Sequence, residues 1–149
     1  MINLIRKEKK NEIKMNQIES KNWFIGATFG IIGALIGGYI WAVIATKTGV
    51  MWGVIALISA GLAGGGFGFP TRGGSRSIRG LIGAILGLMS IILGYYFIYI
   101  SPINLGAQSI PIIPAKYMSF GKFWSITVGP IDYLFLIIGI YEGYKFGSM

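Results

Sequence analysis

The 149-residue sequence contains no cysteine and no histidine. Without cysteine, the chain cannot form disulfides, thiolate nucleophiles or cysteine-based zinc sites. Without histidine, it lacks the usual general base, the usual metal and haem ligand, and the Ser-His and Cys-His nucleophile pairs. We therefore predict no catalytic residues, no cofactor and no bound metal, and we expect a protein that is not an enzyme.

Charged residues are also scarce. They make up 12% of the chain, with only five Asp and Glu residues in total, while 54% of the residues are hydrophobic. A water-soluble domain of this length could not bury so much apolar surface. The composition therefore predicts an integral membrane protein.

The apolar residues fall into four runs, at about 23–44, 50–69, 81–100 and 128–145. A helix needs about 20 residues to cross a hydrocarbon core about 30 Å thick. We therefore predict an all-α polytopic membrane protein with four transmembrane helices, with a tight turn over residues 45–49. Residues 1–21 are predicted to form a basic cytoplasmic tail or a short surface helix, and residues 22–149 the four-helix transmembrane domain.

The segment 101–125 before the last run differs from the others. Pro102, Pro111 and Pro114 exclude a continuous helix across it. Aromatic residues recur at helical spacing after the third proline, at Tyr117, Phe120, Phe123 and Trp124. This spacing predicts a short interfacial helix before the last span. A segment that dips into the bilayer is the alternative.

The distribution of cations predicts the orientation. Ten of the thirteen Lys and Arg residues fall on one side of the predicted spans, namely six within 1–21 together with Arg72, Arg76, Arg79 and Lys145. The other side holds Lys47, Lys116 and Lys122. Cytoplasmic loops carry such an excess of Lys and Arg. We therefore expect a multi-pass protein of the cell membrane with both termini in the cytoplasm.

The formal net charge is +8, which in a soluble protein would suggest nucleic acid binding. Here the cations flank apolar runs. The expected partners are therefore membrane lipids, including anionic head groups on the cytoplasmic side, and no nucleic acid.

Small residues recur at about four-residue spacing within three of the runs. They are Gly26, Gly30, Ala34 and Gly38 in the first run, Gly53, Ala56, Ala60, Gly64 and Gly68 in the second, and Gly83 and Gly87 in the third. In lipid, such stripes let two helix backbones approach closely, and this packing supplies much of the contact energy. They can pack the chain's own four helices. The alternative is a face that forms a homo-oligomer or attaches the chain to a larger membrane complex.

Arg72, Arg76 and Arg79 lie in a Gly- and Ser-rich linker over residues 71–80, predicted to be a loop in water. The glycines do not form a nucleotide-binding loop, because no strand precedes them and no Gly-Lys-Ser/Thr opens a helix. We expect these arginines to bind lipid phosphates or to fix the topology.

Asp132 and Glu142 are the carboxylates that follow the basic tail. An acid inside a membrane is a candidate functional group, because its burial is costly. Asp132 also suits the first turn of a helix after Pro130, and Glu142 suits an ion pair with Lys145. Ten positions, or about 15 Å of helix rise, separate the two acids, so they cannot form a catalytic pair.

Two segments resemble a known group of proteins. They are Gly38-Tyr-Ile-Trp-Ala-Val-Ile-Ala45, followed by Thr48-Gly49 and the Gly-rich second run, and the closing Gly129-Pro-Ile-Asp-Tyr-Leu-Phe135. Both are similar to segments of small prokaryotic four-helix integral membrane proteins that have no established activity. The likeness extends over most of the chain from Trp23 onward. It implies the fold and a membrane location, and no substrate.

The expected function is that of a structural or accessory subunit that packs through its Gly and Ala faces. A small oligomeric channel or transporter is the alternative, although the predicted spans hold few of the polar groups that selective pathways need. A lipid-modifying enzyme is a third possibility, and no group of residues supports it.

Overall fold

A computed structural model describes residues 2–49, 53–100 and 118–149, and there the regular secondary structure consists of helices alone. The described residues form five helices: α1 (Ile2–Thr48), α2 (Gly53–Gly68), α3 (Arg76–Ile100), α4 (Phe120–Thr127) and α5 (Pro130–Ser148). The predicted all-α class is confirmed.

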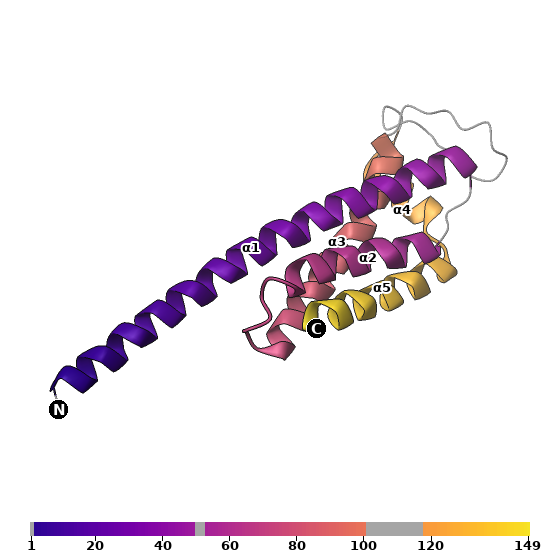
Figure 1. The fold of residues 1–149 in the computed structure, drawn as a ribbon. Coiled ribbons are helices and arrows are strands. Elements are labelled where there is room, and N and C mark those ends of the chain that lie inside the picture. Colours follow the sequence, from indigo (N-terminus) through magenta and orange to yellow (C-terminus); the bar gives the residue numbers. More distant parts are fainter. Residues whose placement is uncertain (1, 50–52, 101–117) are drawn as a thin grey trace.

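The four long helices form one bundle (Figure 1). Helices α2 and α3 contact each other, and each also contacts both α1 and α5. In the described part of the chain, α1 and α5 do not contact each other, so α2 and α3 lie between them. Helices α2 and α5 both end beside the first turn of α3 (Figure 1). We call this end of the bundle, with Arg72, Arg76 and Arg79, the arginine end.

The opposite end of the bundle holds α4 (Figure 1) and a group of aromatic side chains. We call it the aromatic end. Its core is built on buried Trp41, Ile91, Tyr95 and Phe123. A smaller cluster nearer the arginine end includes Phe67.

The outward faces of the bundle are apolar. Large exposed side chains occur on each of the four long helices and include Ile36, Ile58, Leu81 and Ile137. Contiguous exposed apolar surface of this extent is unusual for a protein in water. It is the surface expected of helices that face lipid.

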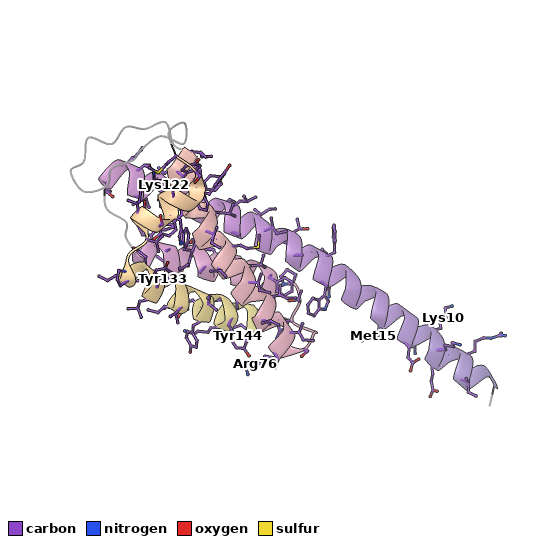
Figure 2. All side chains as sticks on the ribbon, turned by 180° about the vertical axis from the view of Figure 1, so that it is seen from behind. Lys10, Met15, Arg76, Lys122, Tyr133 and Tyr144 are labelled. Atoms are coloured by element: carbon purple, nitrogen blue, oxygen red, sulfur yellow. The ribbon has the colours of Figure 1, made fainter. Side chains whose placement is uncertain are left out.

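Helix α1 is longer than the sequence predicts. It runs unbroken through 47 residues, roughly 70 Å at 1.5 Å per residue, so that the predicted tail and the first span form one helix. Its amino-terminal part extends beyond the bundle (Figure 1), and Lys10 and Met15 lie on this extension (Figure 2). No proline precedes residue 70, so the chain lacks the strongest helix breaker throughout this stretch.

The predicted turn over residues 45–49 is wrong, because the helix continues to Thr48. The hydroxyl groups of Thr46 and Thr48 donate to the carbonyl oxygens of Val43 and Ile44, so neither threonine interrupts the helix. Gly49 follows with a φ of 69°, a left-handed conformation that glycine adopts at little cost.

By length and composition, two helical segments can cross a membrane, Asn22–Thr48 and Arg76–Ile100. A third span results if α4 and α5, which meet at an angle of 104°, count as one broken span. Helix α2 is apolar but has only 16 residues, or about 24 Å. The structure therefore supports two to three spans by this criterion.

Helix α3 begins at Arg76, five residues before the predicted span and inside the predicted loop. The connection from α2 is correspondingly short, and the amide of Gly74 donates to the carbonyl oxygen of Thr71 across it. Helix α5 begins at Pro130, as the sequence predicts, and continues to Ser148.

The predicted short helix before the last span is present as α4, where the Ser119 hydroxyl accepts a hydrogen bond from the Lys122 amide. The Tyr99 hydroxyl on α3 donates to the carbonyl oxygen of Met118 over 2.8 Å, which ties the start of α4 to the bundle. The part of the predicted helix over 114–117 lies outside the described residues.

Candidate functional site

The small-residue stripe of α1 faces the neighbouring helices. A methyl group added at Gly30 would lie 2.5 Å from Cδ1 of Leu86, and one at Gly38 would lie 2.8 Å from the carbonyl oxygen of Ser90. At Gly26 it would lie 2.6 Å from the Thr71 side chain. Ala34 is buried between them. Because no side chain fits at the three glycine positions without displacing a neighbour, they set the spacing of α1 from α2 and α3.

The two glycines singled out on α3 face α5. A methyl group at Gly83 would collide with the carbonyl oxygen of Gly143 and lie 2.8 Å from the α-carbon of Gly147. At Gly87 it would lie 3.1 Å from the carbonyl oxygen of Gly139. The backbones of α3 and α5 are therefore in direct contact along three turns.

Helix α2 joins the same contact. A methyl group at Gly64 would collide with the carbonyl oxygen of Gly143. Three helix backbones thus meet at Gly143. The sequence interpretation missed the α5 partners Gly139, Gly143 and Gly147, although they show the same four-residue spacing as the stripes on the other helices.

The three arginines do not share one environment. Arg72 and Arg76 are exposed at the arginine end, and the Arg72 guanidinium lies over the Phe69 ring at 4.4 Å from its centroid. Arg79 is only 5% exposed. Its Nη1 donates to the carbonyl oxygen of Gly68 over 3.3 Å and its Nη2 to that of Ser148 over 3.1 Å. Arg79 therefore binds two helix ends rather than lying in a loop in water.

Asp132 lies in the first turn of α5, as predicted. Its Oδ2 accepts a hydrogen bond of 2.8 Å from the Gly129 amide, so the carboxylate caps the start of the helix. The half-buried carboxylate also lies near the buried Tyr95 side chain of α3. Asp132 thus joins the beginning of α5 to the aromatic end of α3.

Tyr95 lies in the centre of the aromatic end. Its ring packs edge-on against Trp41 of α1, with centroids 4.9 Å apart, and against Trp124 of α4 at 5.0 Å. The buried Nε1 of Trp41 has no hydrogen-bond partner in the described part of the chain. This cluster holds three helices together.

Glu142 pairs with Lys145, as the spacing predicts, with 3.9 Å between Oε1 and Nζ. It also lines an apolar groove of about 510 Å³ on the outer surface between α2 and α5. Glu142 and Asp132 therefore lie in different surroundings, one on the surface of the bundle and one at the start of α5.

Within residues 2–49, 53–100 and 118–149, no group of three His, Cys, Asp or Glu side chains could hold a metal ion. The chain has no match among protein-family models, curated proteins or solved structures, and the resemblance to four-helix prokaryotic membrane proteins stays a prediction.

Proposed function

We propose that this chain is a non-enzymatic integral membrane protein that serves as a structural or accessory subunit of a larger membrane assembly. The observation that carries the proposal is the backbone contact of α2, α3 and α5 at Gly143. Interfaces of this kind hold helices together in lipid, where the hydrophobic effect between helices is absent. They leave little space inside the bundle for a substrate.

Four membrane crossings are part of the proposal, by α1, α2, α3 and α5. Helix α2 lies against both helices that are long enough to span, and its outward side chains Val54, Ile58 and Leu62 are exposed and apolar. Its length of about 24 Å is short of a 30 Å core. Local thinning of the bilayer accommodates a mismatch of this size at modest cost.

Both termini are proposed to lie in the cytoplasm, with the arginine end on the same side. The exposed Arg72 and Arg76 mark this end, and Lys122 lies at the opposite end of the bundle (Figure 2). The excess of cations on the proposed cytoplasmic side supports this orientation.

The exposed extension of α1 supports the proposal that the chain binds a partner protein. Lys9, Lys10 and Met15 on this extension are exposed, and Figure 1 shows no other helix beside it. Most helical stability in proteins comes from packing against other elements, which the described helices do not provide along the extension. A partner that packs along the extension would stabilise it, which suits an accessory subunit.

The interior of the bundle does not favour a channel for ions or solutes through a single copy of the chain. The buried hydroxyl groups of Ser59, Thr71 and Ser90 all donate to backbone carbonyl oxygens. They are therefore already satisfied and do not line a wet channel. A channel or transporter would have to form between several copies.

The proposal is tested by solubilising native membranes in a mild detergent and measuring the mass of the purified particle. We expect a complex larger than one chain, whose partner is lost when residues 2–18 are deleted while the four-helix bundle stays folded. A folded monomer without partner would contradict the accessory role. Ion flux through liposomes containing the pure protein would support the channel instead.

A further inference from the structure

Internal packing leaves a groove open on the surface between α2 and α5. Its volume of about 510 Å³ lies within the range of small-ligand sites. The α2 wall includes Val54, Ile58, Gly61 and Gly65, and Glu142 and Phe146 form the α5 wall. Apart from Glu142, the lining is apolar.

Two glycines keep this groove open. A methyl group at Gly65 would meet only Cβ of Phe146, at 3.9 Å, whereas one at the adjacent Gly64 would collide with the α5 backbone. At Gly61 it would lie 3.2 Å from the Phe146 ring. Gly65 is therefore not needed for helix contact inside the chain, and its missing side chain leaves space on the surface.

The groove runs along most of α2, over a length similar to the hydrocarbon depth of one leaflet of a bilayer of ordinary thickness. Val54 and Gly65 are eleven positions apart on α2, which corresponds to roughly 16 Å of helix rise. Half of a hydrocarbon core about 30 Å thick is similar. A single acyl chain from one leaflet could therefore lie along the groove.

Cations flank the arginine end of the groove. Phe69 lies one helical turn beyond Gly65, and the exposed Arg72 guanidinium lies over its ring. Lys145 on α5 is half exposed and pairs with Glu142 only over 3.9 Å. Arg79 holds the ends of α2 and α5 together, so these cations belong to the same end of the bundle.

We propose that the groove binds an acidic phospholipid, with one acyl chain along α2 and α5 and the phosphate beside Arg72 and Lys145. Charge-assisted hydrogen bonds from Arg and Lys to phosphate are strong, and an acidic phospholipid lacks the quaternary ammonium group that neutralises the phosphate of a phosphatidylcholine head group. This inference rests on the proposed membrane location of the bundle. It assigns a function to Arg72 and Lys145 that Arg79 cannot share, because its guanidinium is buried.

The test measures the unfolding midpoint of the full chain in detergent at increasing concentrations of phosphatidylglycerol. The same series is measured with phosphatidylcholine that has the same acyl chains. A bound lipid raises this midpoint according to its concentration and dissociation constant. We expect phosphatidylglycerol to bind about tenfold more tightly than phosphatidylcholine. Replacing both Arg72 and Lys145 by Gln should abolish this preference. Replacing Lys47 and Lys122 by Gln, at the aromatic end, should preserve it.

Gly65→Leu fills the groove at a position with open space, and it should weaken the binding of both lipids by about tenfold. If this variant does not fold, Ile58→Trp introduces bulk at an exposed position of the same groove. Wild-type lipid affinity in the folded variant would overturn the proposal. So would a preference for phosphatidylglycerol that survives in the Arg72 and Lys145 double variant.

Two further measurements separate the possible failures. If Gly65→Leu reduces the particle mass but leaves lipid binding unchanged, a second copy of the chain occupies the groove, and the lipid proposal is wrong. Alkaline carbonate washing of native membranes tests the location independently. If the chain resists washing but shows no lipid preference, only the proposed lipid site is wrong. If washing releases the chain, the proposed membrane location is wrong as well.

Discussion

Arg79 donates a hydrogen bond of 3.1 Å to the carbonyl oxygen of Ser148, which joins the first turn of α3 to the last turn of α5. The same guanidinium donates to Gly68 at the end of α2. The last carbonyl groups of a helix lack partners within the helix and carry partial negative charge. One buried cation therefore satisfies two helix ends.

Replacing Arg79 by Ala should lower the free energy of unfolding in detergent by about 1.5–3 kcal/mol for each hydrogen bond to the charged group. Arg79→Lys should recover part of this loss, because an ammonium group cannot reproduce the guanidinium fork. The matched control is Arg76→Ala, an exposed position three residues away, with an expected change within about 0.5 kcal/mol. Equal effects at both positions would contradict the capping role.

Two glycine substitutions should differ in their effects. A methyl group at Gly143 would lie 2.5 Å from the carbonyl oxygen of Gly83 and 3.2 Å from the α-carbon of Ala84. Gly143→Ala should therefore destabilise the bundle by about 1–3 kcal/mol, because backbone atoms would have to move. Gly65→Ala, which enters open space, should be neutral or slightly stabilising, since Ala favours helix. Thermal unfolding of the two purified variants would show the difference.

The proposed topology can be mapped with single cysteines, because the natural chain has none. A membrane-impermeant maleimide should label Lys10→Cys and Gly73→Cys from the cytoplasmic side and Lys122→Cys from the other side. Gly73 has no atom within 4 Å of an added methyl group, so the substitution should not disturb the fold. Labelling of Gly73→Cys and Lys10→Cys from opposite sides would overturn the topology.

Asp132 should act on stability through its bond to the Gly129 amide. Asp132→Ala removes the acceptor and should cost about 0.5–2 kcal/mol, the usual range for a helix cap. Asp132→Asn keeps an oxygen that can accept the same bond, so its cost should be smaller. Unfolding in detergent provides this comparison.

Proton flux in liposomes tests a different role for the same residue. If Asp132 relays protons, the Asn variant should stay folded and lose a flux that the unmodified protein shows. If the carboxylate only caps α5, both proteins should show the same flux.

Several features of the fold could be predicted because they depend on local sequence. Pro130 and Asp132 mark the start of α5, and the spacing of Glu142 and Lys145 on one helix fixes their ion pair. Four apolar runs indicated the four long helices. The extent of α1 could not be predicted, because composition changes near residue 22 from polar to apolar while the backbone stays helical.

Tertiary contacts account for what the sequence did not reveal. Arg79 resembles Arg72 and Arg76 in sequence, and only the helix ends at Gly68 and Ser148 distinguish it. The role of Gly143 likewise depends on its contacts with two other helices, α2 and α3. The groove arises because Gly65 faces outward while Gly64 faces α5, and this is a difference of one position on α2.

Helix α1 continues without a break from its extension into the bundle. Its extension and Trp41 belong to one rigid element, and the Trp41 ring lies against Gly94 on α3. In the proposed orientation this ring lies near the opposite face of the bilayer, so the proposed partner on the extension would be joined to it by continuous helix. Docking on one side of the membrane would thus reach the other side without any moving loop.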